Sequence, residues 1–277
     1  MKSERDELAR EHRADPEGHL VVGLAEGADD AHRGDVGADA AQARDAPALL
    51  IDADNDRAAR FPFLSELEQL RLQVELMGVR VDQNLERMRS VLHHGNPCEA
   101  EQAVAADDEI DAMQVSLTER CYDLLAREQP VASDLRLIVS VVRITAELER
   151  IGDLALRVVK LTPDHALLRQ STEIFDLLAT LADLSLDHYR LALRSFATQS
   201  TDLAQEVSAG SPEVGVVSDR LVGEVHRLQG DDAVPVAVKA MTAGQALSRI
   251  DDHATVLGAR LRYLFTGDPD HLAAEVR

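Results

Sequence analysis

An apolar stripe with helical spacing runs through the middle of the chain. Its steps alternate between four and three residues, which is the repeat of one helix face, whereas a strand would repeat every two residues. A stripe of this length is typical of a long amphipathic helix that packs into a bundle. The stripe therefore predicts a bundle helix in this segment and argues against a strand. Its members are Leu137, Val141, Ile144, Leu148, Ile151, Ala155 and Val158.

A second stripe with the same steps lies near the C-terminus. The polar residues beside the two stripes also correspond, because Ser248–Asp252 stands where Glu149–Asp153 stands in the first. A long internal repeat with three helical segments in each copy predicts an all-α fold of two tandem three-helix bundles. The second stripe is Val236, Ala240, Ala243, Leu247, Ile250, Ala254 and Leu257. Further matching segments are 76–90 with 181–195 and 99–111 with 203–215.

The repeat also gives the expected domain boundaries. Thr162-Pro163-Asp164 interrupts the helical pattern, so we expect one bundle over 61–163 and the other over 164–277. Residues 1–60 are rich in Ala, Asp and Gly and have no sustained period. We expect them to be a disordered extension, or a segment upstream of the true start of the protein.

Capping and breaking residues mark the expected helix ends. Asn96 and Pro97 are suited to the cap and first turn of a helix, and Pro130 disfavours helical geometry in the residue before it. The first copy is therefore expected to have helices that end at about His94 and Gln129, followed by a third that carries the stripe. In the second copy we expect helices at about 166–199, 202–229 and 233–265, with a kink at Gly210-Ser211-Pro212.

The charge balance excludes several classes of function. The chain has 29 Lys+Arg and 50 Asp+Glu, a formal net charge of -21, which repels a nucleic-acid backbone and an anionic membrane surface. No apolar run is long enough to span a bilayer, and the first ten residues are charged where a signal peptide is apolar. We therefore expect a cytoplasmic protein without membrane insertion and without direct nucleic-acid binding.

Cys98 and Cys121 fall on one expected helix, about 35 Å apart at 1.5 Å per residue, so they are expected to be reduced thiols.

Two pairs of acids, each with a spacing of four residues, are the candidate site. One pair lies opposite the first stripe, and the other flanks the stripe of the preceding helix. If these helices are antiparallel neighbours, four carboxylates meet at the bundle surface, which requires either protonation or a neutralising cation. Oxygen ligands alone favour hard cations. The alternative is a solvated acidic face that Arg143 and Arg150 balance. The two pairs are Glu149 with Asp153 and Asp107 with Asp111.

Other kinds of chemistry find little support in the sequence. No phosphate-binding loop of the G-x-x-x-x-G-K-[ST] type occurs, and no G-x-S-x-G turn supports a catalytic triad. The histidines are scattered, and we expect His188 and His226 to be isolated surface or capping residues. These absences favour a protein that is not an enzyme.

Three segments taken together resemble the PhoU family, the accessory and regulatory proteins of high-affinity phosphate uptake. They are QPVASDLRLIVSVVRITAELERIGDLA at 129–155, DDEID at 107–111 and RIDDHATVLGARLRYLFTG at 249–267. The resemblance covers about 61–267 and implies tandem three-helix bundles that bind metal clusters on their surface through Glu/Asp-x-x-x-Asp motifs. Carried over by position, the ligands that it implies in the first copy are Asp107, Asp111, Glu149 and Asp153.

The second copy departs from this motif. Ser211, Gly215 and Ser248 stand where the first copy has three of its acids, and Asp252 is the acid that remains. We therefore expect a cluster of iron, manganese, magnesium or zinc in the first repeat and the loss of the second cluster, with Asp252 as a remaining ligand. Asp251 and His253 are expected to be polar surface residues, because neighbouring helix positions point about 100° apart.

The resemblance also implies a function. It implies a non-enzymatic negative regulator of phosphate uptake and of phosphate-starvation signalling. The partners that it implies are the ATPase subunit of the phosphate ABC importer and a PAS-containing sensor histidine kinase, and the protein is expected to be a homodimer. Two alternatives remain at this point: a metal-dependent hydrolase or metal-storage protein that uses the same acids, and a helical interaction protein unrelated to phosphate. A surface site without an evident base or pocket weakens the hydrolase.

Overall fold

The computed structural model describes residues 52–276, with side chains for 61–272. The described residues are helical and contain no strand, which confirms the all-α prediction. The expectation for residues 1–51 lies outside this range. The main helices are α1 (Asp52–His94), α2 (Pro97–Arg127), α3 (Ser133–Val159), α5 (Thr172–Thr198), α7 (Pro212–Val225) and α8 (Ala233–Thr266). The shorter ones are η1 (Thr162–Asp164), α4 (His165–Leu168), α6 (Thr201–Ser208) and η2 (Pro269–Val276).

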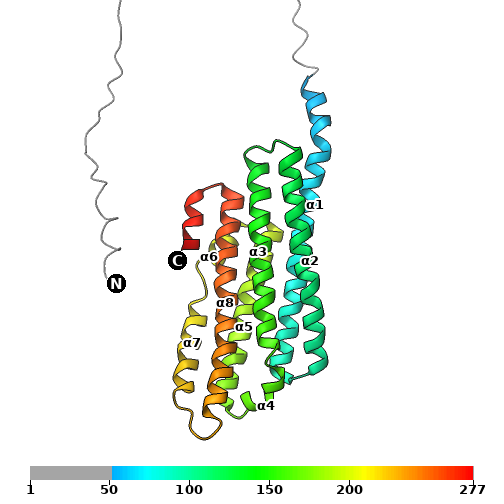
Figure 1. Cartoon of the computed structure of the whole chain (residues 1–277). Coiled ribbons are helices and arrows are strands. Elements are labelled where there is room, and N and C mark those ends of the chain that lie inside the picture. The colour runs from blue at the N-terminus through cyan, green and yellow to red at the C-terminus, as the bar shows by residue number, and fades with distance from the viewer. Residues whose placement is uncertain (1–51, 277) are drawn as a thin grey trace, which may run out of the picture. The chain divides into compact units, whose positions relative to one another are not determined.

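The helices form two trios that follow each other along the chain. Helices α1, α2 and α3 make the first trio, and α5, α8 and the pair α6 and α7 make the second, as Figure 1 shows. Helices α3 and α8 lie side by side in the middle of the molecule, and α1 also contacts α5. The trios share one continuous apolar core within a single compact unit, Leu49–Arg277. This arrangement confirms two tandem three-helix bundles.

The two apolar stripes form the centre of this core. All seven residues of each stripe are buried, as the helical spacing predicts. Small residues on α8 let its neighbours come close: a Cβ atom on Gly258 would lie 2.5 Å from the backbone nitrogen of Ser208. Any side chain at Gly258 would therefore push α6 away from α8. No described helix has the length and apolarity that a membrane span requires.

The start of α2 is built as its sequence predicts. The side chain of Asn96 accepts a hydrogen bond from the Cys98 backbone N–H at 3.0 Å, and Pro97 occupies the first turn. Both cysteines lie on α2 and are unbonded to each other, Cys98 exposed and Cys121 buried. Burial raises the pKa of the Cys121 thiol to about 11, so the thiol is protonated and unreactive near neutral pH.

Several helix ends differ from the sequence prediction. Helix α1 begins at Asp52 instead of at residue 61. The predicted first helix of the second copy is divided, since Ser171 caps a new start of α5 by accepting from the Ile174 N–H at 3.4 Å. The predicted kink in the next helix is a complete break between α6 and α7. There Gly210 has a left-handed φ of 76°, and Pro212 begins a new helix because it has no N–H to continue the old one.

A buried histidine joins three helices of the second trio. His188 on α5 donates from Nδ1 to the carboxylate of Asp251 on α8 at 2.6 Å and from Nε2 to the Val207 carbonyl on α6 at 3.0 Å. Both partners are acceptors, so the ring is best satisfied with a proton on each nitrogen. Burial lowers the pKa of His188, but the hydrogen bond and charge of Asp251 outweigh it and leave the pKa raised.

The expectation that His188 and Asp251 are surface residues is therefore wrong. His188 is 8% exposed and Asp251 is 6% exposed. Each polar group compensates the burial of the other, which the spacing of residues along one helix does not reveal. The pair fixes the crossing of α5 over α8.

The raised pKa of His188 predicts that the second trio is less stable in alkaline solution. A raised folded pKa contributes stability that is fully present below the unfolded pKa, near 6.5, and is lost as the pH rises through the folded pKa. Between about pH 6 and pH 9, we expect the free energy of unfolding to fall by on the order of 1 kcal/mol more in the wild type than in His188→Gln. Urea unfolding at several pH values measures this, with the exposed His226→Gln as the control. Equal pH slopes in all three proteins would contradict the assignment.

Candidate functional site

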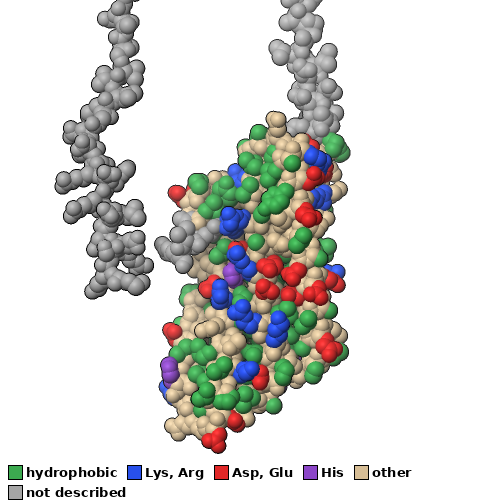
Figure 2. Space-filling model, viewed as in Figure 1, with side chains coloured by type: hydrophobic (Ala, Val, Ile, Leu, Met, Phe, Trp, Pro, Cys, Tyr) green, Lys and Arg blue, Asp and Glu red, His purple; other side chains and the backbone are tan. Residues whose placement is uncertain are grey.

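The four acids of the first copy lie where α2 and α3 face each other. Figure 2 shows acidic side chains gathered over these two helices. Asp107 is 5% exposed, Glu149 is half-buried, and Asp111 and Asp153 are exposed. The charges of Asp111, Glu149 and Asp153 each raise the pKa of Asp107, so the four acids lie within electrostatic reach. We call Asp107, Asp111, Glu149 and Asp153 the acidic cluster.

Gly152 makes room for the most buried of these acids. A Cβ atom at Gly152 would lie 2.9 Å from Oδ1 of Asp107, closer than such atoms approach in proteins, and 3.7 Å from the side chain of Ile110. A glycine inside a helix costs about 1 kcal/mol relative to alanine. The position therefore keeps a costly residue where it lets a carboxylate lie against the α3 backbone. The role of Gly152 was not predicted from the sequence, although a glycine inside a strong helical pattern is itself a signal of close approach.

The environment of Asp107 opposes its negative charge. Its pKa is raised from 3.8 to about 6, first by burial and then by the charges of Asp111, Asp153 and Glu149. Lys160, at the end of α3, acts in the opposite direction. Asp107 receives no hydrogen bond from any described residue. A buried carboxylate among like charges and without a donor lowers the stability of the fold when it is ionised.

Two other members of the cluster are affected in the same direction. Burial is the first cause of the raised pKa of Asp111, and the charge of Asp153 is the second. For Glu149, burial is again first, followed by Asp153 and Asp111, while Arg150 opposes the shift. The repulsion thus extends across both helices and is not confined to one acid pair.

The chemistry of the cluster fits a hard cation. Its ligand atoms are all carboxylate oxygens, the donors that magnesium, manganese and ferric iron prefer. A bound cation would also remove the repulsion that now raises three pKa values. In the described part of the chain, no three His, Cys, Asp or Glu side chains already converge as they would around one ion. Binding would therefore require the carboxylates to turn toward each other from their present positions.

The second trio uses the corresponding positions differently. Ser248, which stands in the place of Glu149, shares a 2.7 Å hydrogen bond with Ser218 of α7. Asp251 stands in the place of Gly152 and holds His188. Asp252 lies exposed on α8, and its part in metal binding stays a prediction.

A contact between the two trios, from Glu147 to His253, was also not predicted from the sequence. Glu147 of α3 is 6% exposed and accepts a hydrogen bond from Nδ1 of His253 on α8 at 2.7 Å. Its other oxygen accepts from Arg150 at 3.0 Å. His253 is therefore half-buried in an interhelical pair rather than a free surface residue. An acid directly beside the buried Leu148 is the signal that could have indicated such a partner.

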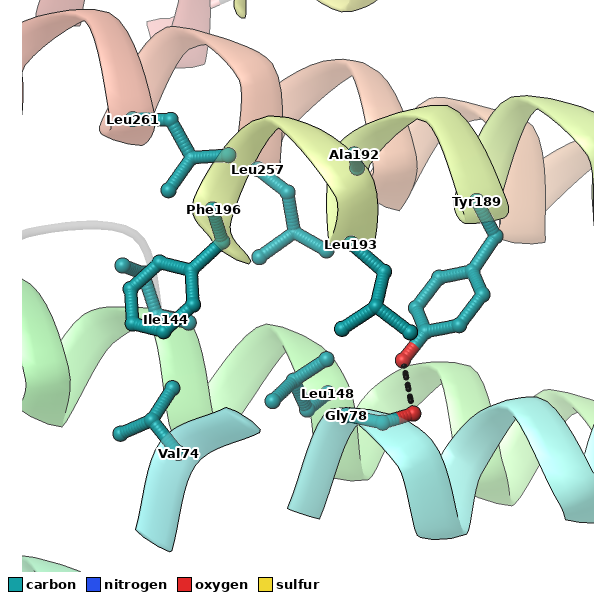
Figure 3. Close-up of a pocket in the computed structure, with 10 residues that line it drawn as sticks. All are labelled: Val74, Gly78, Ile144, Leu148, Tyr189, Ala192, Leu193, Phe196, Leu257 and Leu261. Atoms are coloured by element: carbon teal, nitrogen blue, oxygen red, sulfur yellow. Dashed lines mark hydrogen bonds between the residues drawn. The ribbon is translucent and has the colours of Figure 1, made fainter. Parts of the chain in front are cut away.

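The apolar cavity between the trios offers no alternative site. It has a volume of about 20 Å³ and lies between α1, α3, α5 and α8, with apolar side chains from all four helices around it in Figure 3. Tyr189 donates its hydroxyl hydrogen to the Gly78 carbonyl at 2.7 Å and contributes the polar atom of the lining side chains. Burial raises the pKa of Tyr189, so its hydroxyl stays protonated. A cavity of this size and lining is a packing defect and not a substrate pocket.

The repulsion within the acidic cluster predicts that neutralising Asp107 stabilises the fold. Because its folded pKa is raised, stability is present at low pH and is lost as the pH rises from about 3.8 to about 6. Near pH 8 and without divalent cations, Asp107→Asn is expected to increase the free energy of unfolding by about 1 kcal/mol. Urea unfolding tests this, with Glu109→Gln, an exposed acid on the same helix, as the matched control. Destabilisation by Asp107→Asn alone would show that the carboxylate has a partner that the structure lacks.

Comparisons with known proteins agree with this architecture. The family model described as the PhoU domain matches residues 74–162, within the first trio. The phosphate-specific transport system accessory protein PhoU of Serratia marcescens is 27% identical, and the match covers 77% of this chain and 88% of that protein. The protein of the same name from Escherichia coli K12 is 29% identical, and the match covers 69% of this chain and 79% of that protein. The crystal structure of PhoU from Pseudomonas aeruginosa has a TM-score of 0.69 and 29% identity, and the match covers 74% of this chain and 100% of that one. Residues 74–162 therefore match the PhoU domain, and the chain is similar to PhoU proteins over about three quarters of its length.

Proposed function

We propose that this protein is a regulatory accessory component of phosphate transport that acts by contact and not by catalysis. The observation that carries the proposal is the extent of the relationship, since the match to proteins named for this role covers 88% and 79% of two of them. The match to the solved PhoU structure extends over the whole of that chain. Both trios are needed to account for matches of this length.

The finer role follows from the PhoU family resemblance. We propose a negative regulator that links the ATPase subunit of the phosphate ABC importer to a PAS-containing sensor histidine kinase, in the cytoplasm and as a homodimer. Long, rigid helix faces suit a protein that reports the state of a transporter to a second protein. The acidic cluster lies at the surface, with Asp111 and Asp153 exposed, and the apolar cavity between the trios offers no base. Both observations favour contact over hydrolysis by the alternative, a metal-dependent enzyme.

Loss of this protein is expected to release the phosphate-starvation response while phosphate is plentiful. A strain without the gene should show raised alkaline phosphatase and altered phosphate uptake, because the transporter no longer restrains the kinase. Complementation with the wild-type gene restores repression and serves as the control. Unchanged phosphatase activity and uptake in the deleted strain would refute the proposed role.

We propose that the acidic cluster binds a hard cation, with iron, manganese, magnesium and zinc as the candidates. Asp107 and Asp111 of α2 and Glu149 and Asp153 of α3 would hold it, so the ion would join the two helices. Its positive charge would replace the repulsion between the carboxylates by attraction. The support is the oxygen-only donor set and the buried Asp107 carboxylate that lacks a hydrogen-bond donor.

Cation binding is expected to stabilise the fold and to depend on the space beside Gly152. Addition of manganese or iron to the metal-free protein should raise the unfolding temperature, and metal analysis after dialysis should find the ion retained. Gly152→Ala places a methyl group where the Asp107 carboxylate lies, and we expect roughly tenfold weaker binding. Gly223→Ala is the matched control, since a Cβ there meets nothing within 4 Å. Equal binding by the two variants, or no retained metal in the wild type, would contradict the cation site.

A further inference from the structure

A row of arginines follows the outer side of α3. Arg143, Arg150 and Arg157 recur every seven residues and are all exposed. Seven residues are close to two helical turns, so the three side chains leave the same side of the helix at intervals of about 10.5 Å. In a chain with 50 acidic and 29 basic residues, a regular line of one charge requires an explanation.

Helix α8 adds a fourth arginine beside this line. The 2.7 Å contact between Glu147 and His253 holds the two helices together just before Arg150. Arg249 lies one turn before His253 on α8, is exposed, and so flanks the same seam. Figure 2 shows Lys and Arg side chains gathered over α3 and α8, next to the acidic cluster. We call Arg143, Arg150, Arg157 and Arg249 the arginine row.

The arginine row is mostly left without acidic partners. Arg150 donates to Glu147, but Arg143, Arg157 and Arg249 form no ion pair with any described residue. Some exposed arginines elsewhere hold two carboxylates each, as Arg127 and Arg190 do, whereas Arg80 and Arg194 form no ion pair with a described residue. The row differs from these in placing two unpaired arginines along one side of a single helix. The row therefore presents positive charge that the protein itself does not neutralise.

The surroundings of the row limit what can neutralise it. From Arg143 to Arg157 it extends over about 21 Å, too far for a single small anion and suited to a ligand with several charges along its length. A nucleic acid would bring its continuous charge against Asp153 and Asp252, which are exposed on the same two helices. Leu135 and Val139 extend the outer side of α3 toward its N-terminus and are 42% and 44% exposed. A ligand with both carboxylates and apolar groups fits this combination.

We propose that the arginine row, together with Leu135 and Val139, is the docking surface for an acidic amphipathic helix of a partner protein. Carboxylates of that helix pair with the unneutralised arginines, and its apolar side chains cover the two exposed residues at the start of α3. The inference concerns the chemistry of the bound segment. It stands independently of the proposed role in phosphate transport.

The test measures binding of a labelled synthetic helix to the full-length protein by fluorescence anisotropy. The peptide has about 20 residues, enough to span the row, with glutamates on one side and leucines on the other. The variant Arg143→Glu/Arg157→Glu reverses two unpaired members of the row. The matched control Arg80→Glu/Arg194→Glu changes the net charge equally at exposed positions on α1 and α5. Circular dichroism and unfolding temperature verify that both variants are folded.

We expect the row variant to bind the peptide at least about tenfold more weakly and the control to change by less than about threefold, with affinity that falls as salt is added. Competition by inorganic phosphate or single-stranded DNA at lower concentration than the peptide would overturn the proposal in favour of a simple anion site or a nucleic acid. No binding of the peptide by the wild type, or equal losses in the two variants, would also overturn it.

Discussion

The apolar stripes of α3 and α8 are buried in one shared core, and each of the other long helices packs against one of these two. Each fully buried Leu or Ile in them contributes roughly 1.5 to 3 kcal/mol. Because the stripes fix which side of each helix points inward, they also fix which residues point outward. The acidic cluster and the arginine row therefore depend on the same burial that holds the trios together.

The two trios use one pair of equivalent positions in opposite ways. In the first, Gly152 leaves space for the Asp107 carboxylate, which forms no hydrogen bond or ion pair with any described residue. In the second, Asp251 occupies the equivalent place and pairs with the His188 imidazole at 2.6 Å. One copy thus keeps uncompensated negative charge close to its surface, whereas the other pairs its buried acid with an imidazole. With the proposed cation site, this difference accounts for a repeat in which only the first copy would take up an external cation.

Helix periodicity made most of the fold predictable from the sequence. The stripes, the Asn96 cap and the placement of four acids on neighbouring helices follow from residue spacing along a helix and from short connections between neighbours. Contacts between distant segments were not predictable in this way: His188 meets Asp251, and Glu147 meets His253, only because α5 and α3 lie beside α8. The break at Gly210 was predicted to be a kink, because glycine and proline are found both at kinks and at complete helix breaks. Whether the helix continues in a new direction or ends there depends on the packing of α6 and α7 against α8.

The first trio holds four carboxylates within mutual repulsion, and Asp107, the most buried of them, is 5% exposed. The most direct measurement is an NMR titration of the Asp107 carboxyl carbon in the cation-free protein. The structure predicts a pKa of about 6, against an ordinary value of 3.8, and a lower pKa when Asp153→Asn removes one neighbouring charge. An Asp107 pKa near 3.8 that does not respond to Asp153→Asn would contradict the account.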